Sequence, residues 1–110
     1  MHTKAKGDLA EQKAKEYLEA QGFEIIDQNV YSRFGEIDLI TKKNNTWHFI
    51  EVKSGSSYEV ALQNLTPSKI NKIVKTIYTF LKKNSLDVEF SVDAVIVTPE
   101  EVELIENITI

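Results

Sequence analysis

Two short stretches of the chain contain residue types that are common at sites of chemistry. Asp38 belongs to the first, residues 35–40, and Glu51 and Lys53 belong to the second, residues 49–53. Charged and apolar residues alternate in both, which is typical of a strand with one buried face. An Asn-Asn dipeptide separates them and suits a tight turn, because Asn adopts positive φ more readily than other non-glycine residues. The sequence therefore predicts an antiparallel hairpin.

The register of this hairpin places two acids opposite each other. With the two Asn residues as the loop, Asp38 faces Glu51, and directly opposed residues share one face of a sheet with Cβ atoms roughly 4.5–5.5 Å apart. Lys53 lies on the same face as Glu51, where it is expected to face Glu36. The opposite face is expected to build the core with Ile37, Leu39, Ile50 and Val52.

Two opposed carboxylates repel each other unless a proton or a cation lies between them. Carboxylate and carbonyl oxygens suit Mg²⁺ or Mn²⁺, and Mg²⁺ is often shared with substrate phosphate. Such an ion acidifies a water and neutralises charge on phosphoryl oxygens, and Lys53 could assist either effect. We therefore expect Mg²⁺ or Mn²⁺ and a phosphate-containing substrate. The alternative is a salt-bridged sheet face, on which Lys53 neutralises Glu36 and Glu51 is solvated.

The elements before the hairpin are a helix and a strand. Residues 8–21 carry an apolar stripe with helical spacing that stops before Gly22. Glu11 borders this stripe, so its carboxylate is expected at the edge of the buried surface. Residues 23–30 are predicted to form the first strand.

The elements after the hairpin complete a mixed α/β pattern. A polar loop at residues 54–57 precedes a second helix, which is expected to begin near Thr66 or Pro67 because Pro suits the first helical position. Residues 88–98 then read as a long strand and residues 102–106 as a short one. A strand, a crossover helix and another strand favour a mixed sheet.

Net charge argues against a broad nucleic-acid surface. The 110 residues include 13 basic and 17 acidic side chains, a formal charge of −4. Phosphate contact relies on cationic surface, and a single Arg leaves little means of reading base edges. Lysines do gather on one face of the second helix, which is more often solvated than phosphate-binding. Lys69 and Lys72 are the candidate substrate contacts on that face.

Several classes of protein are excluded or disfavoured by composition. The absence of Cys excludes disulfides, zinc fingers, thiol catalysis and iron–sulfur ligation by this chain alone. No apolar run approaches the roughly 20 residues needed to span a bilayer. Residues 1–15 are charged and lack the apolar core of a signal peptide. We expect a cytoplasmic protein without a membrane partner.

The two stretches of the hairpin resemble those of the YraN-like family, predicted members of the PD-(D/E)XK nuclease superfamily. The resemblance covers nearly the whole chain. Ile37 stands where the superfamily name has Pro, and Ala10 replaces a Gly often found before the helix Glu. Further matching features are Gly7, Glu11, Ala14, Tyr17, Leu18, Gly22, Phe23, Asn29, Lys69 and residues 92–94.

The resemblance implies roles for particular residues. Asp38 and Glu51 would hold the metal together with the carbonyl of Val52, and Lys53 would orient or activate the attacking water. Glu11 would support the metal site directly or through water. Lys69 occupies the position of a basic residue on the second helix, where it would contact the substrate backbone.

We therefore expect one nuclease-like domain over residues 1–110, of the α/β class, with a restriction-endonuclease-like αβββαβ core and a mixed central sheet flanked by helices. The expected function is that of a metal-dependent endonuclease that hydrolyses DNA phosphodiester bonds and recognises structure or ends rather than sequence. The alternative is a non-catalytic nucleic-acid-binding or protein-interaction module on the same fold. A homodimer through the acidic last hairpin and the apolar tail is a further possibility.

Four other residues receive structural interpretations. His48 is expected at the edge of the core rather than as a ligand. Trp47 and Phe49 are expected to pack beneath the site or against the first helix. Asp93 is expected to cap or border the site.

Overall fold

A computed structural model describes the backbone of residues 2–109 and the side chains of residues 8–109; Met1 and Ile110, the ends of the expected domain, lie outside the described residues. Three helices and five strands follow one another in the order α1 (His2–Ala20), β1 (Glu24–Ser32), β2 (Gly35–Lys43), β3 (Thr46–Ser54), α2 (Tyr58–Leu62), α3 (Pro67–Lys83), β4 (Phe90–Val97) and β5 (Val102–Ile105).

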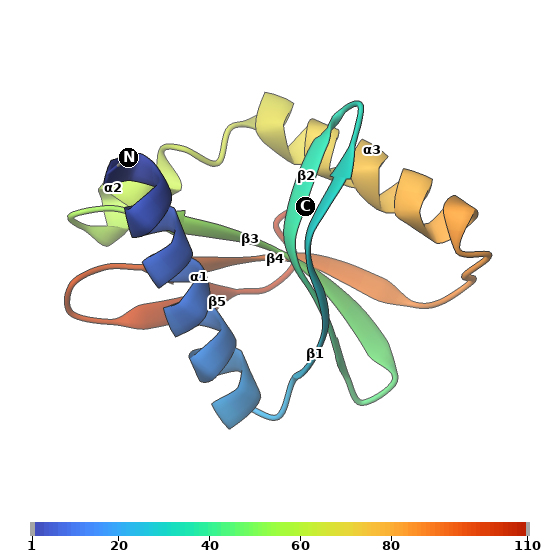
Figure 1. Ribbon diagram of the computed structural model, residues 1–110, viewed down its shortest axis with the longest axis horizontal. Helices are drawn as coiled ribbons and strands as arrows, with labels where there is room; N and C mark the ends of the chain where they lie inside the picture. Colours follow the sequence, from blue (N-terminus) through green and yellow to red (C-terminus); the bar gives the residue numbers. More distant parts are fainter. Residues whose placement is uncertain (1, 110) are drawn as a thin grey trace.

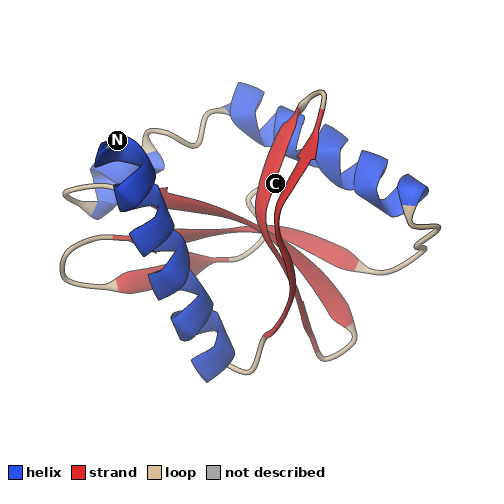
Figure 2. Cartoon of the chain, viewed as in Figure 1, coloured by secondary structure: helices blue, strands red, loops and turns tan. Residues whose placement is uncertain are grey.

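The five strands form one mixed sheet in the order β1-β2-β3-β4-β5. Strands β3 and β4 pair in parallel, and the other neighbours pair antiparallel. The parallel pair requires a crossover connection, which α2 and α3 provide. Figure 2 shows helices flanking the sheet. The expected αβββαβ order and mixed sheet are therefore confirmed, and the architecture is compatible with a restriction-endonuclease-like fold.

Separate apolar clusters join the helices to the sheet. On one side, the buried stripe of α1 packs on β2, β3 and β4 through Ala10, Ala14, Leu18, Leu39, Ile50, Val95 and Val97. On the other side, α3 packs through Ile73, Ile77 and Leu81 onto Ile37, Ile40, Phe49 and Val92. A small third cluster of Ala61, Ala94 and Ile96 lies under α2. The sheet is thus positioned by apolar contacts on both faces.

The turn between β2 and β3 has the predicted form. Asn44 and Asn45 have φ values of 51° and 67°, and positive φ at both central residues is the requirement of a type I′ hairpin turn. The register that follows pairs Leu39 with Ile50 and Thr41 with His48, as predicted.

The ladder between β2 and β3 ends at the pair Leu39–Ile50, although both strands continue. Beyond this point β2 remains paired with β1 alone, and the β1–β2 hairpin curves out of the sheet toward α3 (Figure 1). Its tip is fixed there by a 2.7 Å hydrogen bond between Ser32 Oγ and Thr76 Oγ1. The two strands therefore separate inside what the sequence predicts as one regular hairpin.

This separation makes three predictions wrong. Asp38 does not pair opposite Glu51, and Glu36 does not pair opposite Lys53, because the ladder has already ended. Ile37 packs in the α3 cluster, whereas Leu39, two residues further along the same strand, packs in the α1 cluster. Strict alternation cannot hold across a strand that bends between the two positions.

Aromatic residues of β3 also differ from expectation. Trp47 and Phe49 pack with Phe80 of α3, at ring-centroid distances of 6.4 and 5.9 Å, and not against α1. Odd-numbered residues of β3 face α3, which decides this packing. His48 lies on the α1 side, edge-on to Phe23 at 5.0 Å, which confirms its place at the edge of the core.

The segment after β3 contains a helix where the sequence predicts only loop. Ser57 caps α2 by accepting a hydrogen bond from Val60 N, and Ala61 is fully buried against the sheet. Five residues are too few for a helical periodicity to be recognised in the sequence. Within the described part of the chain, no helix has the length and apolar character needed to cross a membrane.

Candidate functional site

Where β2 separates from β3, a side chain of β2 forms a hydrogen bond with the backbone of β3. Val52 N donates a 2.7 Å hydrogen bond to Asp38 Oδ2. A continued ladder would pair Val52 with Ile37, so the carboxylate replaces the missing strand neighbour. Asp38 is only 9% exposed, and the bond fixes one of its oxygens against the backbone of β3.

Glu51, which precedes Val52 on β3, is the second acid of the site and lies near Asp38. The hydrogen bond and the charge of Glu51 both act on Asp38, so the two carboxyl groups lie close together, although they are not opposed in the ladder. Lys53 Nζ lies 3.2 Å from Glu51 Oε2, with side chains 24% and 12% exposed. Lys53 therefore pairs with Glu51. The alternative interpretation, a salt-bridged sheet face, requires Lys53 to pair with Glu36 instead.

Burial, followed by the hydrogen bond and the negative charge of Glu51, raises the pKa of Asp38 to about 8. The N–H of Val52 and the charge of Lys53 oppose this rise without cancelling it. Near neutral pH Asp38 therefore favours its protonated form. A divalent cation could take the place of that proton, because it neutralises both carboxylates at once.

Glu11 of α1 is a third acid near this pair. Burial raises its pKa first, and the charges of Asp38, Glu36 and Asp8 add to the rise. With its amide nitrogen turned toward α1, Asn29 donates to both carboxylate oxygens of Glu11 at 3.2 Å. The placement of Glu11 at the edge of the buried surface agrees with the sequence prediction.

Asn29 had no predicted role, and the structure gives it one. It lies in β1 at the position opposite Asp38, between the pairs Gln28–Leu39 and Val30–Ile37. Its φ of 53° is left-handed, a conformation that Asn tolerates better than most residues. An Asn in the middle of a strand is itself uncommon, and that is the signal by which the sequence could have identified it.

Glu36 completes the group of acids. It lies opposite Tyr31 across the β1–β2 hairpin and accepts a hydrogen bond from the tyrosine side chain. Burial and the charge of Asp38 raise the pKa of Glu36, and Tyr31 and Lys53 lower it. We call the four residues Glu11, Glu36, Asp38 and Glu51 the acidic cluster.

The acidic cluster offers a small set of metal ligands. Among the described residues, no group of three or more His, Asp or Glu side chains is arranged to hold a metal ion. The predicted ligands are two side chains, Asp38 and Glu51, and the Val52 carbonyl. Mg²⁺ commonly binds through one or two carboxylates and fills its other positions with water and phosphate. The oxygen donors fit such an ion, and so does the pKa of Asp38, which burial and then Glu51 raise.

The two predicted substrate lysines lie at different places. Lys69 is exposed in the first turn of α3 and lines a cleft together with Lys53. Lys72 is also exposed but lies against the start of β2, where its Cβ is 3.8 Å from the position of an added Cβ on Gly35. The structure therefore brings Lys69, but not Lys72, to the cleft beside the acidic cluster.

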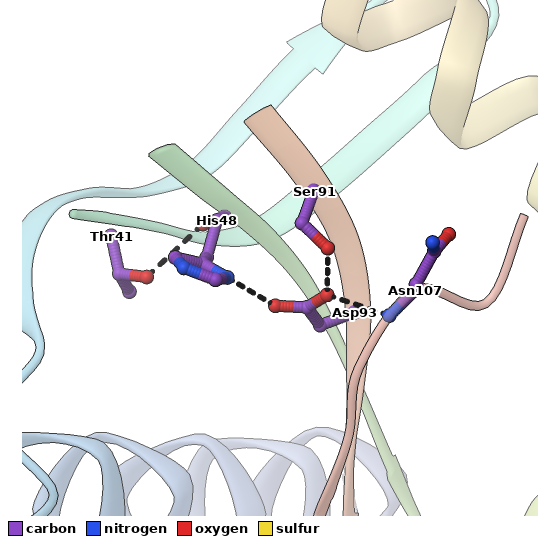
Figure 3. Close-up of polar contacts among 5 residues, drawn as sticks. All are labelled: Thr41, His48, Ser91, Asp93 and Asn107. Carbon is purple, nitrogen blue, oxygen red and sulfur yellow. Dashed lines mark hydrogen bonds and ion pairs between the residues drawn. The ribbon is translucent and has the colours of Figure 1, made fainter. Parts of the chain in front are cut away.

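Asp93 belongs to a separate polar network (Figure 3). It is fully buried, and it accepts hydrogen bonds from Ser91 Oγ at 2.5 Å and from Asn107 N at 2.9 Å. His48 Nδ1 lies 2.6 Å from its other oxygen. Asp93 therefore joins β3, β4 and the C-terminal segment, and the prediction that it caps or borders the site is corrected.

Comparison with known proteins identifies a family. The family model described as "Uncharacterised protein family UPF0102" matches residues 10–97, a span that contains the whole acidic cluster. A UPF0102 protein of Sulfurimonas denitrificans is 52% identical over 108 residues, which cover 98% of this chain and 99% of the relative. A UPF0102 protein of Aliarcobacter butzleri is 45% identical over 108 residues, with 97% and 98% covered. One from Helicobacter pylori strain HPAG1 is 45% identical over 106 residues, with 96% and 92% covered.

Proposed function

The chain belongs to the UPF0102 family, and we propose that its acidic cluster binds Mg²⁺ or Mn²⁺ and hydrolyses phosphodiester bonds in DNA. The observation that carries this proposal is the convergence of Asp38, fixed by Val52 N, and Glu51, which pairs with Lys53. The resemblance of the two hairpin stretches to the YraN-like family and the PD-(D/E)XK nucleases gives independent support.

Each residue has a distinct part in the proposed reaction. Asp38, Glu51 and the Val52 carbonyl would hold the ion, which when bound would neutralise phosphoryl charge and acidify a water. The Val52 N–H keeps one oxygen of Asp38 in place. Lys53, held by Glu51, would orient the attacking water and donate to a phosphate oxygen. Glu11 would accept hydrogen bonds from water on the α1 side.

Recognition of DNA structure rather than sequence follows from the available donors. The guanidinium of Arg33, the single Arg of the chain, lies over the ring of Phe34 at 4.8 Å. A stacked guanidinium is less free to bond the edge of a guanine. Lysines supply most of the positive charge, and they contact phosphate without reading a base.

The alternative proposal is a non-catalytic nucleic-acid-binding or protein-interaction module. It has one observation in its favour: Lys53 already pairs with Glu51, so part of the negative charge is neutralised without a metal ion. Calorimetric titration with Mn²⁺ separates the two proposals. Failure of Mn²⁺ to bind with both acids intact would favour the interaction module.

The test of hydrolysis compares single-stranded, duplex and branched DNA with Mg²⁺ or Mn²⁺. We expect Asp38→Asn and Lys53→Ala each to lower the cleavage rate by about 100-fold or more, as is usual for residues that act directly on a reacting group. Asp87→Asn and Lys82→Ala change exposed residues by the same charge and should cleave like wild type. Equal cleavage by all five proteins would identify a contaminating nuclease and reject the proposal.

A further inference from the structure

A cleft lies outside the carboxyl ends of the parallel strands β3 and β4. Its volume is about 870 Å³. Figure 1 shows the first turns of α1 and the short helix α2 at this end of the sheet. We call it the cationic cleft, and its lining consists of Leu9, Ala10, Lys13, Val52, Lys53, Ser54, Gly55, Ser56, Asn64, Lys69, Val97, Thr98 and Pro99.

The charge of the cationic cleft is opposite to that of the whole chain. Lys13, Lys53 and Lys69 come from three different elements, α1, β3 and α3, and no Asp or Glu is among the described lining residues. Lys13 and Lys69 form no ion pair with a residue that the structure describes. Lys53 is paired with Glu51, so the uncompensated ammonium groups of the lining are those of Lys13 and Lys69. Two such groups beside Lys53 in an acidic protein make a local site for an anion.

The position of Lys69 strengthens this interpretation. Thr66 caps α3 by accepting a hydrogen bond from Lys69 N, which places Lys69 in the first turn. A cation is unfavourable there, because the helix dipole makes the N-terminus positive, and the first turn contains no acid to offset it. The helix end and the lysine therefore add their positive potentials at the wall of the cationic cleft.

Apolar side chains form the rest of the wall. Ala10 and Val97 are 5% exposed at its base, and Leu9 presents 57% of its surface at its edge. Clefts of about 300–1,000 Å³ take ligands of small-molecule size, so a stacked duplex is too wide to enter. One or two unstacked nucleotides fit, with a base against the apolar wall and phosphates on the lysines.

We propose that the cationic cleft binds the unpaired end of a DNA strand beside the acidic cluster. Val52 and Lys53 belong to both sites, so a strand held in the cleft passes directly to the predicted metal ligands. The preferred substrate is then DNA with a single-stranded end. This inference rests on the proposed function for its substrate, and it adds Lys13 to the residues that bind it.

The test measures DNA binding without metal, so that it does not depend on cleavage. A fluorescent ten-nucleotide oligo(dT) and a blunt duplex of equal length are titrated in EDTA and followed by anisotropy. The double variant Lys13→Gln/Lys69→Gln should bind oligo(dT) about tenfold more weakly and lower the salt slope by about 1.4, or 0.7 for each lost phosphate contact. The control Lys82→Gln/Lys83→Gln removes the same charge from the far end of α3 and should stay within about twofold of wild type.

The outcomes separate this inference from the proposed function. Equal weakening by both double variants, or equal binding of blunt duplex and oligo(dT) by wild type, would overturn the cationic cleft as the site. Cleavage that is unaffected by Lys13→Gln/Lys69→Gln would reject the cleft and leave the hydrolase proposal standing. Selective loss of oligo(dT) binding in a protein that cleaves nothing would support the cleft and reject hydrolysis.

Discussion

Val52 donates its backbone N–H to Oδ2 of Asp38 at 2.7 Å, at the point where β2 leaves β3. The contact links the fold to the candidate chemistry. The carboxylate of Asp38 is otherwise surrounded by apolar core and by other acids. The backbone N–H of Val52, which holds it, does not titrate. The position of Asp38 is therefore independent of pH, while its charge is not.

Metal binding should depend strongly on pH. The pKa of Asp38 is raised to about 8, so below that pH a proton competes with the ion. Mn²⁺ affinity is expected to rise about tenfold for each pH unit between 6 and 8, and to level above 8, because one proton leaves as the ion binds. Calorimetry in two buffers of different ionisation enthalpy measures the proton release directly. Constant affinity over this range would contradict the raised pKa of Asp38.

Asp38→Asn should stabilise the metal-free protein at high pH. Because the folded-state pKa of Asp38 lies above its ordinary value, the stability that its protonated form contributes is complete below about pH 4 and is lost as pH rises through about 8. Asn stays neutral and still accepts from Val52 N. The melting temperature of the variant minus that of wild type should increase from pH 5 to pH 9. The increase should be roughly 4 °C for each kcal/mol by which the free energies of unfolding of the two proteins diverge.

Asp38→Ala provides the contrast. It also removes the charge but leaves the Val52 N–H without its acceptor, which costs about 1–3 kcal/mol at every pH. Thermal unfolding of the two variants at pH 5 and pH 9 separates the hydrogen bond from the charge. Identical curves for Asn and Ala would show that the bond contributes nothing.

Asn29 is expected to control the protonation of Glu11. Its amide lowers the pKa of Glu11 against burial and the neighbouring acids. Asn29→Gly keeps the left-handed backbone, removes the amide and should raise that pKa, as followed by carboxyl carbon NMR. Asn29→Ala should raise it equally and also destabilise the fold by about 1–2 kcal/mol, because Ala is strained at φ 53°. An unchanged titration in both variants would mean that Asn29 does not bond Glu11.

Asp93 should matter for stability and not for metal binding. Asp93→Ala leaves His48, Ser91 and Asn107 without their buried acceptor, which is expected to cost about 3 kcal/mol or more in the free energy of unfolding. Asp93→Asn retains an oxygen for Ser91 and should cost less. Denaturant unfolding measures both changes. A tenfold loss of Mn²⁺ affinity in the folded Asn variant would instead return Asp93 to the border of the acidic cluster.

The meeting of Asp38 and Glu51 could be predicted because local rules decide it. The Asn-Asn turn sets the register from Lys43–Thr46 to Leu39–Ile50, and this register brings Asp38 and Glu51 to the first positions beyond the last pair. The end of the ladder at Leu39 could not be predicted in this way. It depends on contacts between the hairpin tip and α3, such as that of Ser32 with Thr76, which are 44 positions apart in the sequence.

Other contacts of the site depend on β1, whose register with β2 the sequence did not predict. In the structure Asn29 lies opposite Asp38 and bonds Glu11, and Glu36 lies opposite Tyr31 and bonds its side chain. Alternation extended along an ideal hairpin predicts none of these pairs. The α2 helix was missed for a different reason, since its five residues are held by one cap and one buried Ala.

The packing of α1 against β4 has a consequence for synthesis of the protein. Ala14 and Leu18 share a cluster with Val95 and Val97, so the first helix contacts a strand that the ribosome completes more than 75 residues later. Native contacts so distant in sequence slow folding, and an amphipathic helix without its strand exposes apolar surface. We therefore expect the apolar face of α1 to stay unpacked until β4 has emerged from the ribosomal tunnel.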